Sequence, residues 1–412
     1  MKTILPGATL GVMGGGQLGR MFVHAAQQMG YFTAVLDPDA SSPAGLVSHH
    51  HIRTPYLDEA GLAQLAQISA AITTEFENVP APALQRLAAS RFVAPAASAV
   101  AIAQDRAQEK AHFTRCGVPV APNAVIETSG QLAALLEEPS AAPGRPKQAS
   151  TPSGGSEPHA VGSVGVNSLL PGILKTARLG YDGKGQVRVK TQAELAAAWD
   201  GLKHVPCVLE KMLPLAAEVS VIVARGADGQ MVNFPVQRNL HRAGILAVTE
   251  VHEGNIDPSL AKQAIAATKS IAEGLGYVGV LCVEFFVLAD GSLVVNEMAP
   301  RPHNSGHYSI DACDQSQFDL QVRTLAGLPL TQPRLHSPSI MLNLLGDLWG
   351  VDGASPAWDR VLALPGAHLH LYGKHEAKPG RKMGHLTLTG ASVAEVRQTA
   401  LAAAALLGID PF

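Results

Sequence analysis

The first third of the chain alternates short apolar runs with segments of helical spacing. Apolar and helical patterns follow one another at residues 8–13, 17–29, 32–36, 61–70 and 71–78. Strands that alternate with helices predict an open, doubly wound α/β domain with a parallel sheet. A further helix is expected over residues 102–116, and Gly117 and Pro119 would end it.

Beyond this point the pattern changes to β-rich runs separated by turns. Two such runs flank Asp290 and Gly291. Asp-Gly between apolar runs predicts a hairpin with a two-residue type I′ turn, in which Ala289 faces Ser292. Hairpins of this kind join antiparallel strands, so a mixed α/β fold is expected for the chain as a whole.

Three domains are predicted from these patterns and from two prolines, Pro329 and Pro333. They comprise an N-terminal α/β domain, a central domain and a small β-rich C-terminal domain, at residues 1–118, 119–330 and 331–412. Residues 140–167 are rich in Pro, Gly, Ser and Ala and lack periodicity. They are expected to form a flexible insertion that buries little, with order resuming at Leu170.

Composition narrows the class of protein. Of 412 residues, 47% are hydrophobic and 16% charged, which is typical of a well-packed soluble protein. The formal net charge of −3 gives no basic footprint for nucleic acid. The four cysteines lack the paired spacing of a disulfide framework or zinc site. No segment is long enough to span a bilayer, so a cytoplasmic protein without membrane or nucleic-acid partners is expected.

The hairpin brings two carboxylates together. Counting outward from the predicted turn, Glu284 falls directly opposite Glu297. Like charges at facing positions are destabilising, so a cation between them is expected, and oxygen ligands favour Mg²⁺. The alternative is a solvated pair that repels weakly. The loop that follows favours the cation, because its prolines would hold Arg301 and His303 in place for an anionic substrate.

A glycine-rich turn follows the first predicted strand. Residues 14–19 read G-G-G-Q-L-G, and Asp37 follows the second strand. This arrangement occurs in dinucleotide-binding domains, where backbone N–H groups approach a phosphate. The same turn also serves as a plain connection between strand and helix, and we favour that interpretation.

Other candidates for anion binding are spread along the chain. Glu75 lies at the carboxyl end of a strand, where ligands of open α/β sheets bind. Arg106 and Lys110 share one helix face. Lys175 precedes a glycine-rich flap at residues 180–186, which is predicted to close over a triphosphate. Each of these also has an interpretation as a solvated surface or an ordinary turn.

Taken together, these motifs resemble the ATP-grasp superfamily. They are Lys175, the flap, residues 210–213 and the hairpin with Glu284 and Glu297. The G-G-G-Q-L-G-R opening, A-P-R-P-H-N-S-G-H at 299–307 and P-G-R-K-M-G-H at 379–385 narrow the resemblance to the N5-carboxyaminoimidazole ribonucleotide synthases of purine biosynthesis. The resemblance runs nearly end to end, apart from the insertion. It implies an ATP-grasp domain between a pre-ATP-grasp domain and a small C-terminal domain.

The resemblance also implies an activity. A homodimeric ligase would consume ATP, bicarbonate and 5-aminoimidazole ribonucleotide, with Mg²⁺ on Glu284 and Glu297. Residues implied to contact ATP are Arg106, Lys175, Gly180, Tyr181, Asp182, Gly183, Lys184, Gly185, Gln186, Glu210, Lys211, Met212, Leu213, Glu218, His241, Asn296 and Glu297. Residues implied to bind the ribonucleotide or bicarbonate are Glu75, Tyr181, Asp182, Arg301, His303, Asn304, Lys374 and Arg381.

Four residues are expected to carry the chemistry: Arg301, His303, Asp182 and Lys175. ATP would phosphorylate bicarbonate to carboxyphosphate, and the substrate amine would attack the activated carbon or CO₂ released beside it. Asp182 or His303 would accept the amine proton. The sequence departs from many ATP-grasp enzymes in one position, since Ala299 stands where they carry Asn. The metal is therefore expected to have fewer protein ligands, with Asn296 on the other side of its strand.

Three alternatives stay open at this point. One is an ATP-grasp ligase that transfers formate to glycinamide ribonucleotide. Another is a nucleotide-binding protein without activity on the same scaffold, which the two metal carboxylates argue against. The third is a nicotinamide-dependent oxidoreductase, which rests on the glycine turn alone.

Overall fold

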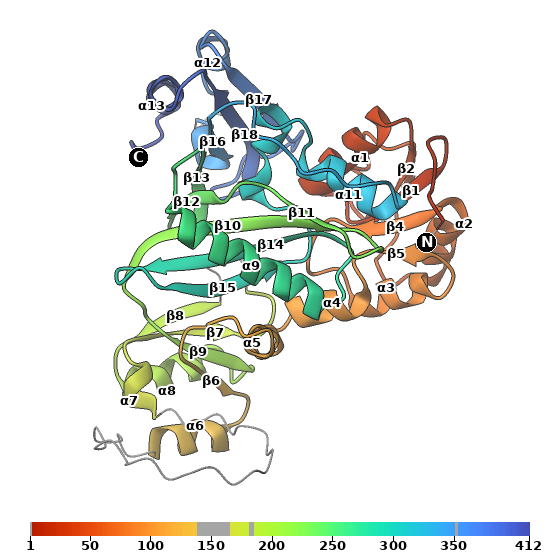
Figure 1. The fold of residues 1–412 in the computed structure, drawn as a ribbon. Helices are drawn as coiled ribbons and strands as arrows, with labels where there is room; N and C mark the ends of the chain where they lie inside the picture. Colours follow the sequence, from red (N-terminus) through yellow and green to blue (C-terminus); the bar gives the residue numbers. More distant parts are fainter. Residues whose placement is uncertain (1, 138–164, 181–184, 351–352) are drawn as a thin grey trace, which may run out of the picture. The chain divides into compact units, whose positions relative to one another are not determined.

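The computed structural model describes residues 2–137, 165–180, 185–350 and 353–412. The chain forms two compact units (Figure 1). Unit 1 comprises Met1–Val120 and Leu215–Phe412, and unit 2 comprises Ala121–Pro214. None of the helices in the described ranges has the length and hydrophobicity needed to cross a membrane.

Unit 1 begins with the predicted doubly wound domain. Its five-stranded parallel sheet has the order β3-β2-β1-β4-β5. The strands are β1 (Thr9–Met13), β2 (Phe32–Leu36), β3 (His50–Ile52), β4 (Ala71–Thr74) and β5 (Phe92–Val93). The helices are α1 (Gln17–Gln28), α2 (Glu59–Ile68), α3 (Ala81–Ala88), α4 (Ala97–Ala103) and α5 (Arg106–Arg115). Neighbouring β1 and β4 carry the glycine turn and Glu75 just beyond their carboxyl ends, at the point where the strand order reverses.

The single helix expected over residues 102–116 is wrong. The chain breaks between α4 and α5, because the Asp105 side chain caps α5 by accepting from the N–H groups of Ala107 and Gln108. The break makes Arg106 the first residue of α5. Arg106 and Lys110 are both buried on this helix, so the solvated face that was left open from their spacing is wrong.

A nine-stranded antiparallel sheet forms the rest of unit 1. Its main order is β15-β14-β10-β12-β13-β16-β18-β17, and β11 pairs with β10. The strands are β10 (Leu215–Arg225), β11 (Met231–Asn233), β12 (Gln237–Arg242), β13 (Ile245–Val251), β14 (Gly279–Leu288), β15 (Leu293–Ala299), β16 (Ser339–Leu345), β17 (Ala367–Leu371) and β18 (Lys382–Thr389). Pairing of β13 with β16 carries the sheet across the predicted boundary at residues 330 and 331.

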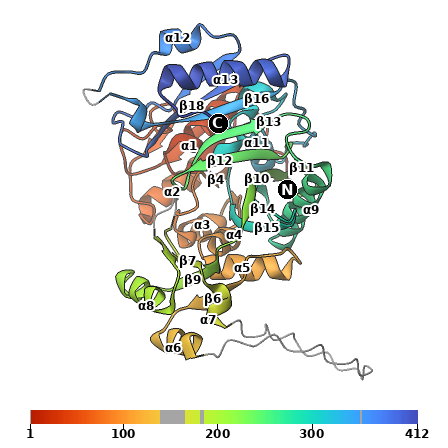
Figure 2. The ribbon, with the colours of Figure 1, turned by 90° about the vertical axis from the view of Figure 1, so that its left-hand side faces the viewer.

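Helices cover both ends of this sheet. They are α9 (Pro258–Gly274), α10 (Ser309–Ala312), α11 (Gln317–Ala326), α12 (Trp358–Leu362) and α13 (Val393–Leu407), with 3₁₀ turns η1 (Asn304–Gly306) and η2 (Gly346–Leu348). Figure 1 shows α9 along β14 and α11 beside α1. Figure 2 shows α13 across β16 and β18. In one core, Phe318 and Val322 of α11 pack with Phe22 of α1, which joins the parallel sheet to the rest of unit 1.

The hairpin between β14 and β15 differs from its predicted turn. Gly291 donates to the Leu288 carbonyl, and Leu288 donates to that of Ser292, which encloses a three-residue loop. Gly291 has a φ of +81°, the left-handed conformation that ends such loops. The type I′ turn, with Ala289 facing Ser292, is therefore wrong.

A bulge restores the predicted facing of the carboxylates. Phe285 pairs with Val295 and Glu284 pairs with Glu297, which leaves Asn296 as the extra residue of β15. The longer loop shifts the register by one residue and the bulge shifts it back. The prediction that Glu284 faces Glu297 is confirmed, although the turn that led to it is not.

Unit 2 is a four-stranded antiparallel sheet with helices packed against it. The order is β6-β9-β7-β8, with β6 (Asn123–Ile126), β7 (Gly172–Thr176), β8 (Gln186–Val189) and β9 (Cys207–Lys211). Its helices are α6 (Ser129–Glu137), α7 (Val166–Leu169) and α8 (Gln192–Gly201). Val166 and Leu169 are fully buried in α7, so the end of the predicted insertion, residues 166 and 167, belongs to a packed helix. Residues 138–164 of the predicted insertion lie outside the described residues.

Candidate active site

The glycine turn after β1 is occupied by carboxylates of the chain itself. Gly15 N–H donates to Asp37 Oδ2 at 2.7 Å. The N–H groups of Gly16 and Gly19 donate to Glu75 at 2.9 and 3.1 Å. A Cβ on Gly16 would lie 2.7 Å from a Glu75 oxygen, which explains the glycine. The backbone donors that would hold a dinucleotide phosphate are thus engaged by the protein. This supports the interpretation of the turn as a plain connection between strand and helix.

Burial raises the pKa of Glu75 despite the two N–H groups that it accepts from. Its side chain anchors the start of α1 to the end of β4. A substrate-binding role for Glu75 stays a prediction.

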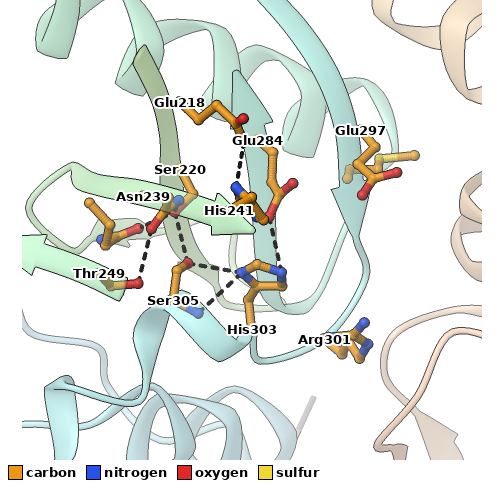
Figure 3. Close-up of polar contacts among 12 residues, drawn as sticks. Glu218, Ser220, Asn239, His241, Thr249, Glu284, Glu297, Arg301, His303 and Ser305 are labelled. Atoms are coloured by element: carbon orange, nitrogen blue, oxygen red, sulfur yellow. Dashed lines mark hydrogen bonds and ion pairs between the residues drawn. The ribbon is translucent and has the colours of Figure 1, made fainter. Parts of the chain in front are cut away.

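The two hairpin carboxylates lie side by side on β14 and β15 (Figure 3). Glu297 Oε2 pairs with the Arg106 guanidinium at 3.0 Å, and Glu284 Oε1 lies 3.2 Å from His303 Nε2. Burial, followed by the charge of Glu297, raises the pKa of Glu284 to about 7. A cation at this pair would relieve the repulsion, so the oxygen donors fit Mg²⁺.

A third acidic residue holds the helix that carries Arg106. Glu109 Oε1 accepts from the backbone N–H of Met298 at 2.7 Å, which ties α5 to β15. Burial raises the pKa of Glu109 to about 8, although the positive charge of Arg106 acts to lower it. This contact was not predicted, because the partner is a backbone group far away in sequence.

Glu218 and His241 form an ion pair on the neighbouring strands β10 and β12. Burial acts to lower the pKa of His241, but the hydrogen bond to Glu218 and the charge of Glu284 outweigh it and raise the pKa. Both residues line a cavity of about 360 Å³ that Leu240 and Phe412 also border. Two residues predicted to contact ATP therefore meet in one concave site.

The loop after β15 carries a partly buried cation, Arg301, and a buried amide, Asn304. Arg301 pairs with Glu77, and this pairing overcomes burial to lower the pKa of Glu77 to about 2. Asn304 is 7% exposed, and neither the oxygen nor the nitrogen of its side-chain amide has a hydrogen-bond partner among the described residues. An unpaired buried amide is costly unless a ligand satisfies it. Glu77 is the second acidic residue beyond the same strand as Glu75, and the sequence alone assigned it no separate role.

Both nitrogens of His303 are engaged by the protein. Nδ1 lies 2.8 Å from Ser305 Oγ, and Nε2 faces Glu284. Burial, followed by the charge of Arg301, lowers the pKa of His303 well below its ordinary value. The ring is neutral near pH 7, and acceptance of the amine proton would require it to leave one of these partners.

The basic turn between β17 and β18 is held by backbone carbonyls. Lys374 Nζ donates to the Lys382 carbonyl at 2.7 Å, and Arg381 donates to that of Glu376 at 2.9 Å. Lys374 lines a cavity of about 430 Å³ together with Trp349 and other residues of this region. A shared role for Lys374 and Arg381 in binding phosphate stays a prediction.

Unit 2 contains a second buried ion pair. Lys175 Nζ lies 2.9 Å from Glu210 Oε2, and their side chains are 7% and 5% exposed. The N–H groups of Lys211 and Met212 donate to carbonyls of Pro122 and Pro171. An adenine edge would therefore have to use other backbone groups of residues 210–213.

The flap is described only at its margins. Gly180 precedes the gap, Gly185 has a φ of +69°, and Gln186 begins β8. The predicted contacts of Tyr181, Asp182, Gly183 and Lys184, and the proposed base Asp182, lie outside the described residues.

Asn296 Oδ1 is buried and has no hydrogen-bond partner in the described ranges.

Comparisons with known proteins cover nearly the whole chain. Family profiles match a ribonucleotide synthetase preATP-grasp domain at residues 7–104, an ATP-grasp domain at 158–318 and a phosphoribosylaminoimidazole carboxylase C-terminal domain at 339–399. N5-carboxyaminoimidazole ribonucleotide synthase of Bacillus subtilis is 38% identical over 94% of this chain and 92% of the relative. The protein of that name from Brucella melitensis is 42% identical over 94% and 98%.

Solved structures agree with these relatives. An N5-carboxyaminoimidazole synthetase from Staphylococcus aureus complexed with ADP has a TM-score of 0.83 at 36% identity, with 98% of each chain covered. An N5-carboxyaminoimidazole synthase from Aspergillus clavatus in complex with ADP and 5-aminoimidazole ribonucleotide has a TM-score of 0.82 at 30% identity, with 97% of this chain and 98% of the other covered.

Proposed function

We propose a role for each site residue of this chain in the reaction of the N5-carboxyaminoimidazole ribonucleotide synthase family, to which the chain belongs. The protein is an ATP-dependent carbon–nitrogen ligase of purine biosynthesis. It carboxylates 5-aminoimidazole ribonucleotide and releases ADP and phosphate. The formate-transferring ligase considered from the sequence is set aside, because relatives over 94% of the chain carry the synthase name.

The observation that carries the residue assignment is the pair Glu284 and Glu297. Two carboxylates face each other where burial raises the pKa of Glu284 to about 7, which fits a site built for a cation. We assign both as ligands of Mg²⁺. When bound, Mg²⁺ would neutralise charge on the phosphates of ATP. Arg106 holds Glu297 in place and adds a positive charge at the same site.

Bicarbonate is proposed as the carboxyl donor. It is a poor electrophile, because its carbon already bears electron-rich oxygens. Transfer of the terminal phosphoryl group from ATP to a bicarbonate oxygen gives carboxyphosphate and ADP. Direct attack of the substrate amine on the carboxyl carbon breaks the bond from that carbon to the phosphate oxygen. In the other route this bond breaks first and releases CO₂, which the amine then attacks. In both routes phosphate leaves and the amine loses a proton. Arg301 is suited to bind the planar carboxylate through its guanidinium, and Asn304 offers unpaired amide atoms.

ATP contacts are proposed in each unit separately. Within unit 1, Glu218 and His241 line the cavity described above. Within unit 2, Lys175 is held by Glu210 and presents a fixed positive charge to the phosphates. Lys374 and Arg381 are proposed to bind the ribonucleotide phosphate. A homodimer in the cytoplasm is also proposed.

The first experiment measures ATP hydrolysis with Mg²⁺ and bicarbonate, with and without 5-aminoimidazole ribonucleotide. Strong stimulation by the ribonucleotide, with labelled bicarbonate carbon in the product, is expected. Glu284→Gln should abolish the stimulation, whereas Glu59→Gln, at an exposed ion pair on α2, should not. Turnover indifferent to the ribonucleotide would contradict the proposed acceptor. Light scattering would test the dimer, for which a single-chain mass is the contrary result.

A further inference from the structure

A chain of buried polar side chains lies behind the metal carboxylates (Figure 3). Thr249 Oγ1 donates to Asn239 Oδ1 at 3.0 Å, and Asn239 Nδ2 donates to Ser220 Oγ at 2.9 Å. Ser220 Oγ lies 2.8 Å from Ser305 Oγ, which lies 2.8 Å from His303 Nδ1. The chain links β13, β12, β10 and the loop after β15.

The backbone shows which nitrogen of His303 accepts. The Ser305 N–H points to His303 Nδ1 at 3.4 Å, and a backbone N–H can only donate. Nδ1 is therefore an acceptor. The neutral ring then has its one proton on Nε2, which faces Glu284 Oε1 at 3.2 Å.

This tautomer sets the direction of the hydrogen bond from Ser305. Because His303 Nδ1 accepts, the Ser305 hydroxyl donates to it at 2.8 Å. The Ser220 hydroxyl has one proton and two acceptors within reach, Gln237 Oε1 at 3.1 Å and Ser305 Oγ at 2.8 Å. The chain ends at the Glu284 carboxylate.

We propose that Ser305 is a positioning residue, which keeps the protonated Nε2 of His303 directed at Glu284 and so orients this carboxylate for its cation. The inference rests on the proposed role of Glu284 as a metal ligand. A histidine that fixes a ligating carboxylate acts as the outer partners of metal sites commonly do. It also follows that His303 orients a ligand in this arrangement and has no ring nitrogen left for the substrate amine.

The test compares Ser305→Ala with Ser309→Ala. Both serines are fully buried in neighbouring turns, but Ser309 donates to the Gly306 carbonyl and accepts from the Gln317 N–H. Histidine ring ¹⁵N shifts report the tautomer directly, and His303→Asn assigns the signal. We expect the Nε2-protonated form in the wild type and in Ser309→Ala. Ser305→Ala keeps the backbone N–H, whose contact with Nδ1 is long at 3.4 Å, but loses the hydroxyl at 2.8 Å, so a mixture of tautomers is expected.

A second readout is the Mg²⁺ dependence of ADP binding, measured by calorimetry. Loss of an outer partner typically weakens metal affinity about 10–100-fold, so Ser305→Ala should need roughly tenfold more Mg²⁺ than Ser309→Ala. Equal Mg²⁺ dependence in the two variants would overturn the proposal, and so would an unchanged tautomer. If Ser305→Ala does not fold, Ser305→Cys replaces the hydroxyl by a weaker donor and should shift the tautomer in the same direction.

Glu284→Gln separates this inference from the role on which it rests. If this variant binds ADP with wild-type Mg²⁺ dependence, Glu284 is not a ligand and the metal assignment fails. The tautomer of His303 would still report whether Ser305 holds the ring.

Discussion

At the scale of single residues, the site is a set of charges that the protein holds in paired positions. Arg301 with Glu77 and Arg106 with Glu297 are partly exposed pairs, whereas Lys175 with Glu210 is buried. Breaking a buried pair leaves an uncompensated charge, at a cost of about 3–5 kcal/mol. Glu284 differs, because it faces another carboxylate, that of Glu297. Its contribution to the free energy of unfolding should therefore depend on pH.

Glu284→Gln should stabilise the protein at pH 8 without Mg²⁺. The folded state raises the pKa of Glu284 from 4.5 to about 7, so the stabilising contribution of the protonated group is present below pH 4.5 and is lost as the pH rises through 7. Glutamine stays neutral and should raise the unfolding free energy at pH 8 by on the order of 1–3 kcal/mol. Thermal unfolding at pH 8 and pH 5 tests this. An equal effect at both values would contradict it.

Arg301→Lys keeps the charge but loses the planar guanidinium. Arg301 pairs with Glu77 through Nε, and lysine cannot match that geometry while also binding a carboxylate at two points. We expect kcat/KM for bicarbonate to fall roughly tenfold to hundredfold, with a small change in melting temperature. Arg334→Lys, at an exposed pair with Asp314, is the matched control and should leave activity unchanged. Equal losses in both variants would refute a specific role.

The sequence predicts individual site residues better than their supporting contacts. The facing of Glu284 and Glu297 follows from a count along one hairpin, and it holds because a longer loop and a bulge compensate. The hydrogen-bond chain through Ser220 and Asn239 could not be predicted. It depends on the pairing of strands from distant parts of the sequence, and no local pattern records that register.

At the scale of elements, the break between α4 and α5 positions Arg106. Asp105 caps α5, and Asp58 caps α2 in the same way through the Gly61 N–H. Asp105→Ala and Asp58→Ala should each lower stability by about 1 kcal/mol. Only Asp105→Ala should also raise KM for ATP, because Arg106 follows the cap directly. Chemical denaturation and ATP saturation curves test the pair. An unchanged KM in Asp105→Ala would show that the cap does not position Arg106.

At the scale of the whole molecule, the large sheet does not stop where the prolines predict a boundary. β16 pairs with β13 along four residue pairs, and Val248 of β13 lies in one core with Ile340 and Leu342 of β16. The C-terminal region was predicted as a domain from composition and short strands. Local patterns cannot show that its first strand extends a sheet begun before it, because that pairing is nonlocal.

Removal of residues 331–412 should therefore prevent folding of what remains. It would expose the backbone edge of β13 and one side of the core that contains Val248, and such edges promote aggregation. Replacement of residues 140–163 by a short Gly-Ser linker is the contrasting deletion, since composition predicts that this stretch buries little. We expect the first variant to be insoluble and the second to keep its melting temperature within about 2 °C, with full ribonucleotide-stimulated ATP hydrolysis. A soluble, cooperatively unfolding 1–330 fragment would mean that the pairing of β13 with β16 joins two regions that fold independently. The shared core would then be an interface between domains.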